Sequence, residues 1–120
     1  MRSWCLAAIA TILLSGCIGG TGDCAALPDR IELSLSEDAL TPDDPAVCRD
    51  REVTLVVTPE VDGIFHIHGY DEQVSATEMT AGEITDLEFI ATRSGQFPIE
   101  LHPDDNTEGV NVGIFTVHEP

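Results

Sequence analysis

Positive charge is scarce in this sequence of 120 residues. It has five arginines and no lysine against 22 aspartates and glutamates, and its formal net charge is -17. A surface this acidic repels phosphate backbones, so the composition argues against nucleic-acid binding. It also attracts cations and favours solubility, which suits an extracytoplasmic or salt-adapted setting.

Sequence patterns that often mark enzymes are missing as well. There is no Ser-His-Asp arrangement, no glycine-rich phosphate loop and no His-Glu-x-x-His motif. The aspartate pairs at 43–44 and 104–105 lie in turn-like segments, where solvated acids are more common than paired catalytic acids. We therefore expect a protein that is not an enzyme.

Residues 1–17 have the pattern of an export signal. Arg2 precedes an apolar run over residues 4–14, which is too short to span a bilayer. The Leu-Ser-Gly-Cys segment that ends at Cys17 resembles the lipobox of bacterial lipoproteins, whose cysteine becomes the acylated first residue. We predict a lipid on Cys17 and an extracytoplasmic protein held at the bacterial cell membrane or envelope; an ordinary secretory signal is the alternative.

Two cysteines, Cys24 and Cys48, remain beyond the lipid site and the signal. In an oxidising compartment an even pair predicts a disulfide, which would stabilise the fold by roughly 3 kcal/mol. Metal ligation by thiolates is the weaker alternative, because no Cys-x-x-Cys spacing exists and neither cysteine is near a histidine. The glycine-rich start of residues 18–29 predicts a flexible tether.

From Arg30 onward, apolar and polar residues alternate with the period of β-strands. The expected strands cover residues 31–35, 53–58, 63–68, 85–91, 97–101 and 110–117, with a short one within 73–80. Two prolines in 40–45 predict a turn or irregular crossing there. Short strands separated by turn residues predict an all-β sandwich over residues 30–120.

The segment from Phe65 to Asp71 reads Phe-His-Ile-His-Gly-Tyr-Asp and holds two of the four histidines and the only tyrosine. On a continuous strand, His66 and His68 would share one face with Tyr70. Two such imidazoles can share copper, zinc, iron or nickel, or can simply be hydrogen-bonded surface groups. We expect Tyr70 to be a packing residue whose hydroxyl finds a partner. Asp71 suggests strand-end architecture, with orientation of an imidazole as the alternative.

This histidine segment, the later turn at residues 80–83 before strand 87–91, and the hairpin at 94–97 together resemble the cupredoxin-like fold. The resemblance covers roughly residues 30–120. It extends to the copper domain of cytochrome c oxidase subunit II and to small cupredoxin-like lipoproteins with a His-x-His-Gly-Tyr-Asp segment. It implies a Greek-key β-sandwich.

The resemblance also implies where copper ligands would lie. His68 best matches the first copper-binding histidine of cupredoxins, and Leu101 aligns with their cysteine ligand. No cysteine or methionine follows Leu101, so a blue-copper centre is not expected. What remains is an all-nitrogen copper(II) site made of His66, His68 and His102, where two loops would meet at one end of the sandwich.

Asp71, Glu100 or Asp104 could add an oxygen ligand to this site. Strand alternation places His102 with Glu100 on the outward face, unless Pro98 or Pro103 creates a bulge. We expect His118, near the C-terminus, to be solvated.

Two functions follow from these patterns. The first is a lipid-anchored, copper-binding module for storage, delivery or sensing. The second is a metal-free docking or structural domain that has a protein partner in the envelope. A copper-dependent redox enzyme is a weaker third hypothesis. Only metal binding requires the three histidines to converge.

Overall fold

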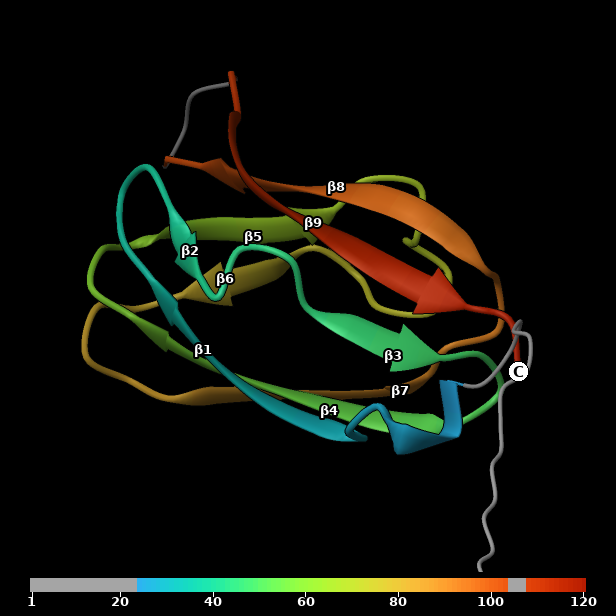
Figure 1. The fold of residues 1–120 in the computed structure, drawn as a ribbon. Coiled ribbons are helices and arrows are strands. Elements are labelled where there is room, and N and C mark those ends of the chain that lie inside the picture. The colour runs from blue at the N-terminus through green and yellow to red at the C-terminus, as the bar shows by residue number, and fades with distance from the viewer. Residues whose placement is uncertain (1–23, 104–107) are drawn as a thin grey trace, which may run out of the picture.

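Residues 24–103 and 108–120 are described by the computed structural model of the protein (Figure 1). The predicted signal 1–17 with Cys17, tether residues 18–23 and Asp104 lie outside the described residues, so the expectations for them stay predictions. No helix in the described ranges is long and apolar enough to cross a membrane.

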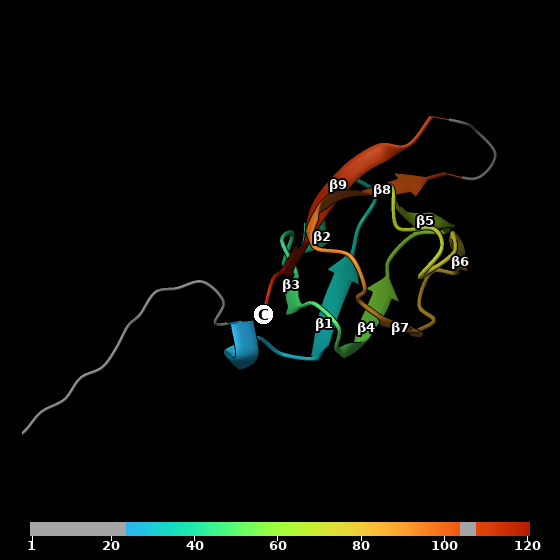
Figure 2. The ribbon, with the colours of Figure 1, turned by 90° about the vertical axis from the view of Figure 1, so that its right-hand side faces the viewer.

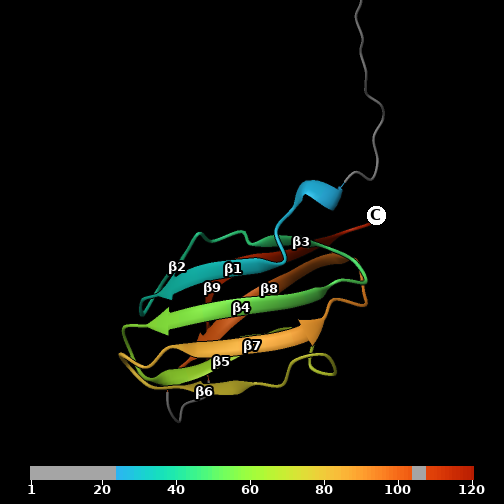
Figure 3. The same ribbon diagram turned by 90° about the horizontal axis from the view of Figure 1, so that it is seen from below.

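Nine strands and one short 3-10 helix make up the described part of the chain. They are η1 (Cys24–Ala26), β1 (Arg30–Leu35), β2 (Leu40–Thr41), β3 (Ala46–Cys48), β4 (Glu52–Pro59), β5 (Gly63–Ile67), β6 (Thr77–Met79), β7 (Thr85–Ile90), β8 (Gly95–His102) and β9 (Val110–His118). They form two sheets, with strand orders β2-β1-β4-β7 and β3-β9-β8-β5-β6. Figures 2 and 3 show the sheets as two packed layers. The predicted all-β sandwich is confirmed.

The core lies between the two sheets because each strand buries one set of alternating side chains. In β8, for example, Phe97, Ile99 and Leu101 are buried while the residues between them are partly exposed. This alternation is the pattern expected for a strand with one face in the core and one face in water. The sequence periodicity therefore identified the inward face of β8 correctly.

Residues 42–45, which include both prolines, form the predicted irregular crossing, and a short strand lies on each side of it. β2 pairs with β1, and β3 pairs in parallel with β9. Before β3, the carbonyls of Asp43 and Pro45 accept hydrogen bonds from the backbone of β9 at 2.9 and 3.0 Å. Proline lacks an N–H group but keeps its carbonyl, so it is tolerated along this edge. Neither short strand was expected from the sequence, because two or three residues are too few to show a periodic pattern.

The disulfide between Cys24 and Cys48 is present, which confirms the predicted pairing. It joins η1 to β3, so the last residues of the expected tether 18–29 are attached to the sandwich. In Figures 1 and 2, η1 lies close to the C-terminus.

Tyr70 does not share a face with His66, as a continuous strand would require. β5 ends at Ile67, and a turn through Gly69, whose φ is 86°, carries Tyr70 into the core. The Tyr70 ring packs at 4.6 to 6.0 Å, centroid to centroid, from three phenylalanine rings, those of Phe89, Phe97 and Phe115. Its hydroxyl donates to the carbonyl of Arg93 and accepts from the N–H of Arg93, both at 3.1 Å. The expected packing role is confirmed.

Candidate metal centre

Two neighbouring strands, β5 and β8, bring the histidines together. The strands are antiparallel, so His66 lies directly opposite Glu100, and Ile64 directly opposite His102. Glu100 and His102 share the outer face of β8 because side chains alternate along a strand. His68 follows the end of β5, and its backbone N–H donates to the Pro98 carbonyl of β8 at 2.8 Å.

Glu100 lies at the centre of the resulting histidine cluster, which consists of His66, His68, His102 and Glu100. Its Oε1 atom is 3.2 Å from His102 Nε2 and 3.8 Å from His66 Nδ1. Its Oε2 atom is 3.8 Å from His68 Nδ1. The ring centroid of His66 is 5.7 Å from that of His68 and 5.9 Å from that of His102. Three imidazoles thus surround one carboxylate.

These distances fit ligands of one metal ion. One ligand atom from each of His66, His68 and Glu100 can be chosen so that all three lie within 4.8 Å of one another. A separation of 3.8 Å is too long for a hydrogen bond. It suits two atoms that each approach a shared ion to about 2 Å.

His102 contributes to the cluster differently from the other two histidines. It is not a member of the close set of three, but it contacts the Glu100 carboxylate directly. Of the residues predicted to bind metal, His66 and His68 therefore lie in the close set, and His102 is a neighbouring fourth donor. Glu100, which the sequence analysis named as one of several possible oxygen donors, has the central position.

The cluster is open to solvent on one side. The side chains of His66, Glu100 and His102 are 20%, 27% and 28% exposed, whereas His68 is 63% exposed. An ion here would lie on the outer face of the sheet, with protein ligands on its sheet side and water on its other side. Such a site has room for exchangeable ligands, and neutral imidazole with carboxylate suits copper(II) and zinc.

The location of the cluster differs from our expectation. We expected the histidines to meet where loops come together at one end of the sandwich, but they meet on a sheet face. The β8–β9 pair is irregular between Ile99 and Glu100 because Val112 is an extra residue in β9. The bulge therefore lies in β9 and leaves β8 regular, and the outward direction of His102 predicted from strand alternation is confirmed.

The position that aligns with the cysteine ligand of cupredoxins lies on the opposite side of the same strand. Leu101 is 3% exposed and belongs to the core. Its side chain packs over Gly63, where an added Cβ would lie 2.8 Å from Leu101 Cδ1. An apolar, tightly packed side chain thus occupies the position where a blue-copper centre would need a thiolate.

Asp71 reaches the cluster from the turn after β5. Its Oδ1 atom lies 2.7 Å from Nε2 of His66. Of the two roles considered for Asp71, contact with an imidazole is therefore the one that the geometry supports. His118, by contrast, lies exposed at the end of β9.

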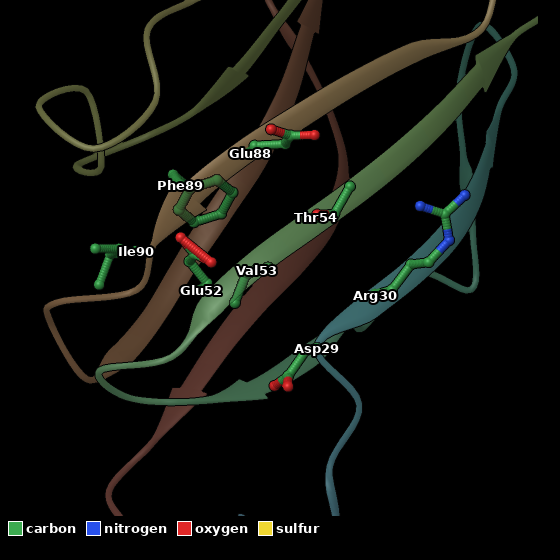
Figure 4. A pocket seen from close by; sticks show the side chains of 8 residues that line it. All are labelled: Asp29, Arg30, Glu52, Val53, Thr54, Glu88, Phe89 and Ile90. Atoms are coloured by element: carbon green, nitrogen blue, oxygen red, sulfur yellow. The ribbon is translucent and has the colours of Figure 1, made fainter.

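The outer face of the other sheet has a shallow pocket of a different kind. Figure 4 shows its lining, which includes the carboxylates of Asp29, Glu52 and Glu88 and the guanidinium of Arg30. Within residues 24–103 and 108–120, the histidine cluster is the one place where at least three potential metal ligands come this close together.

No family model matches this chain, and no curated protein matches it in sequence. Solved structures do match. Auracyanin from Roseiflexus castenholzii aligns with a TM-score of 0.58 and 16% identity over 77% of this chain and 98% of its own. A chain of a heme-copper terminal oxidase dimer aligns with a TM-score of 0.58 and 14% identity, over 82% of this chain and 76% of that one.

The blue copper oxidase of Nitrosomonas europaea aligns with a TM-score of 0.58 and 16% identity over 75% of this chain. This chain spans only 38% of that oxidase, so the likeness concerns one domain of a larger protein. Identities this low establish the fold alone. Together with the two packed sheets, these structural alignments show that this chain folds as a cupredoxin-like domain.

Proposed function

We propose that this protein is a lipid-anchored, copper(II)-binding module of the bacterial cell envelope that serves in copper storage, delivery or sensing. The observation that carries the proposal is the close set formed by His66, His68 and Glu100, whose ligand atoms lie within 4.8 Å of one another. His102 would add a further nitrogen from beside Glu100.

Copper is favoured over other metals on two grounds. Divalent copper binds most tightly to a given nitrogen and oxygen site among the first-row divalent ions. The similar structures include proteins named for copper, such as the blue copper oxidase and the heme-copper oxidase. With Leu101 in place of a thiolate, the expected centre is a tetragonal copper(II) site of nitrogen and oxygen ligands.

Lipid anchoring rests on the sequence. The Leu-Ser-Gly-Cys segment ending at Cys17 would hold the domain at the membrane, and 22 acidic residues would concentrate cations near it. Metabolic labelling with radioactive palmitate should mark the wild-type protein and a Cys5→Ser variant but not a Cys17→Ser variant. Unlabelled wild-type protein would refute the anchor.

Copper binding is tested by titrating the domain without residues 1–17 with copper(II), followed by electron paramagnetic resonance. We expect one ion per chain and a tetragonal spectrum with nitrogen couplings. His66→Ala, His68→Ala and Glu100→Gln should each weaken binding at least about 10-fold, since each removes a ligand. His118→Ala is the matched control, because His118 lies on the same sheet outside the cluster.

Two results would contradict the proposal. Absent binding, or weak binding that none of the cluster substitutions changes, would leave a metal-free docking domain. Zinc that resists displacement by excess copper would refute the choice of metal.

A further inference from the structure

His66 has a carboxylate beside each of its ring nitrogens. Nε2 lies 2.7 Å from Oδ1 of Asp71, and Nδ1 lies 3.8 Å from Oε1 of Glu100. The first distance is that of a short, charge-assisted hydrogen bond, and the second is not a hydrogen bond. The two nitrogens are therefore in different situations.

The chemistry of the two groups determines which nitrogen carries the proton. An ionised carboxylate accepts hydrogen bonds and donates none, so Nε2 must be the donor to Asp71. In the neutral ring, Nδ1 then carries the lone pair. Nδ1 is the nitrogen that faces Glu100 and the rest of the cluster.

The turn after β5 gives Asp71 a fixed position, although its side chain is 62% exposed. The backbone N–H of Tyr70 donates to the Ile67 carbonyl, and the Tyr70 side chain is fully buried. The Arg93 side chain donates to the Gly69 carbonyl from the neighbouring loop. Asp71 thus follows a residue that is anchored in the core, and the turn directs it back toward β5.

We propose that Asp71 is a positioning residue that holds His66 as the Nε2–H tautomer and thereby makes Nδ1 its metal-binding atom. This inference rests on the proposed function for the metal, whereas the tautomer is a property of the metal-free protein. Carboxylates that hydrogen-bond to a ligating imidazole orient the ring and increase its basicity, and their loss commonly weakens metal binding 10- to 100-fold.

The first measurement uses metal-free, nitrogen-15-labelled protein. Long-range proton–nitrogen spectra should show His66 protonated on Nε2, with that proton protected from solvent exchange. Asp71→Ala should abolish the protection. Glu72→Gln should keep it, because this substitution removes the same charge from the adjacent position but leaves the hydrogen bond between Asp71 and His66 in place. A His66 ring protonated on Nδ1, or protection that survives in Asp71→Ala, would overturn the inference.

The second measurement is the copper(II) affinity of Asp71→Asn and Glu72→Gln, with pulsed paramagnetic resonance of the non-coordinating ring nitrogens. We expect Asp71→Asn to weaken binding about 10-fold or more and to change the signal of the remote His66 nitrogen. Glu72→Gln should do neither. Equal affinities for Asp71→Asn and Glu72→Gln would refute the positioning role while leaving copper binding intact. If copper does not bind at all, the proposed function fails, and the metal-free spectra alone decide the tautomer.

Discussion

At the scale of single residues, Tyr70 has an unusual electrostatic setting. Burial raises the pKa of Tyr70 above its usual value, and the hydrogen bond from the Arg93 backbone and the Arg93 charge only partly oppose this. The chain has no lysine and no second tyrosine, and Cys24 and Cys48 are joined in a disulfide. Alkaline titration of the mature domain should therefore report mainly on Tyr70.

We predict that stability falls as the pH rises above about 10, the ordinary pKa of tyrosine. The unfolded chain releases the Tyr70 proton there while the folded chain retains it, so the unfolded state binds fewer protons and gains stability. The slope approaches about 1.4 kcal/mol per pH unit until the folded-state pKa is reached. Urea unfolding between pH 9 and 11 measures it.

Tyr70→Phe is the matching variant. At pH 8 it should lower the free energy of unfolding by about 1 to 3 kcal/mol, because the partly buried hydrogen bonds between the Tyr70 hydroxyl and the Arg93 backbone are lost. Above pH 10 its stability should stay level. An alkaline slope equal to that of the wild type would show that another group is responsible.

The two histidines of the close set should contribute unequally to copper(II) affinity. His66 is 20% exposed and contacts Asp71 and Glu100, whereas His68 is 63% exposed. Ordering an exposed side chain on binding costs rotamer entropy, and a preorganised ligand avoids that cost. We predict that His66→Ala weakens copper(II) binding more than His68→Ala does. The reverse order in the titrations would contradict this reasoning.

At the scale of elements, Gly109, which directly precedes β9, lies against the ring of His102 at the end of β8. A Cβ added at Gly109 would lie 2.7 Å from Cε1 and 2.8 Å from Nε2 of His102. Side-chain atoms at this position would displace the ring from Glu100. The absence of a side chain at Gly109 thus allows His102 to reach the cluster.

We predict that Gly109→Ala shifts the nuclear magnetic resonance signals of His102 and weakens copper binding about as much as His102→Ala. In a double-mutant cycle, adding Gly109→Ala to His102→Ala should then change affinity little, since both act through the same ring. Additive losses would mean that Gly109 acts on the cluster by another route.

At the scale of elements, the direction of side chains on a strand could be predicted from the sequence, but the pairing of strands could not. The alternation in 97–101 correctly put Leu101 inside and His102 outside, because the period of a strand is a local property. The register that sets His66 opposite Glu100 is not local, since it depends on how β5 pairs with β8. For that reason the candidate histidines could be named from the sequence, but their meeting place on the sheet face and the central position of Glu100 could not.

At the scale of the whole molecule, the disulfide joins the first described residues to the edge of the five-stranded sheet. Its strand, β3, is separated from β5 by β9 and β8. We predict that the double variant Cys24→Ser, Cys48→Ser lowers the free energy of unfolding by about 3 kcal/mol. Copper(II) affinity should be unchanged, because no cluster residue lies on β3 or η1. Loss of copper binding in the folded variant would contradict this separation.

The two faces of β8 have different environments. Leu101 packs in the core, whereas its neighbours Glu100 and His102 lie in the cluster on the outer face. Replacing cluster residues should therefore leave the foldedness of the domain nearly intact. During evolution, metal ligands on such a face can be gained, exchanged or lost one at a time without first rebuilding the interior. The same property makes this sheet face a practical starting point for engineering metal sites.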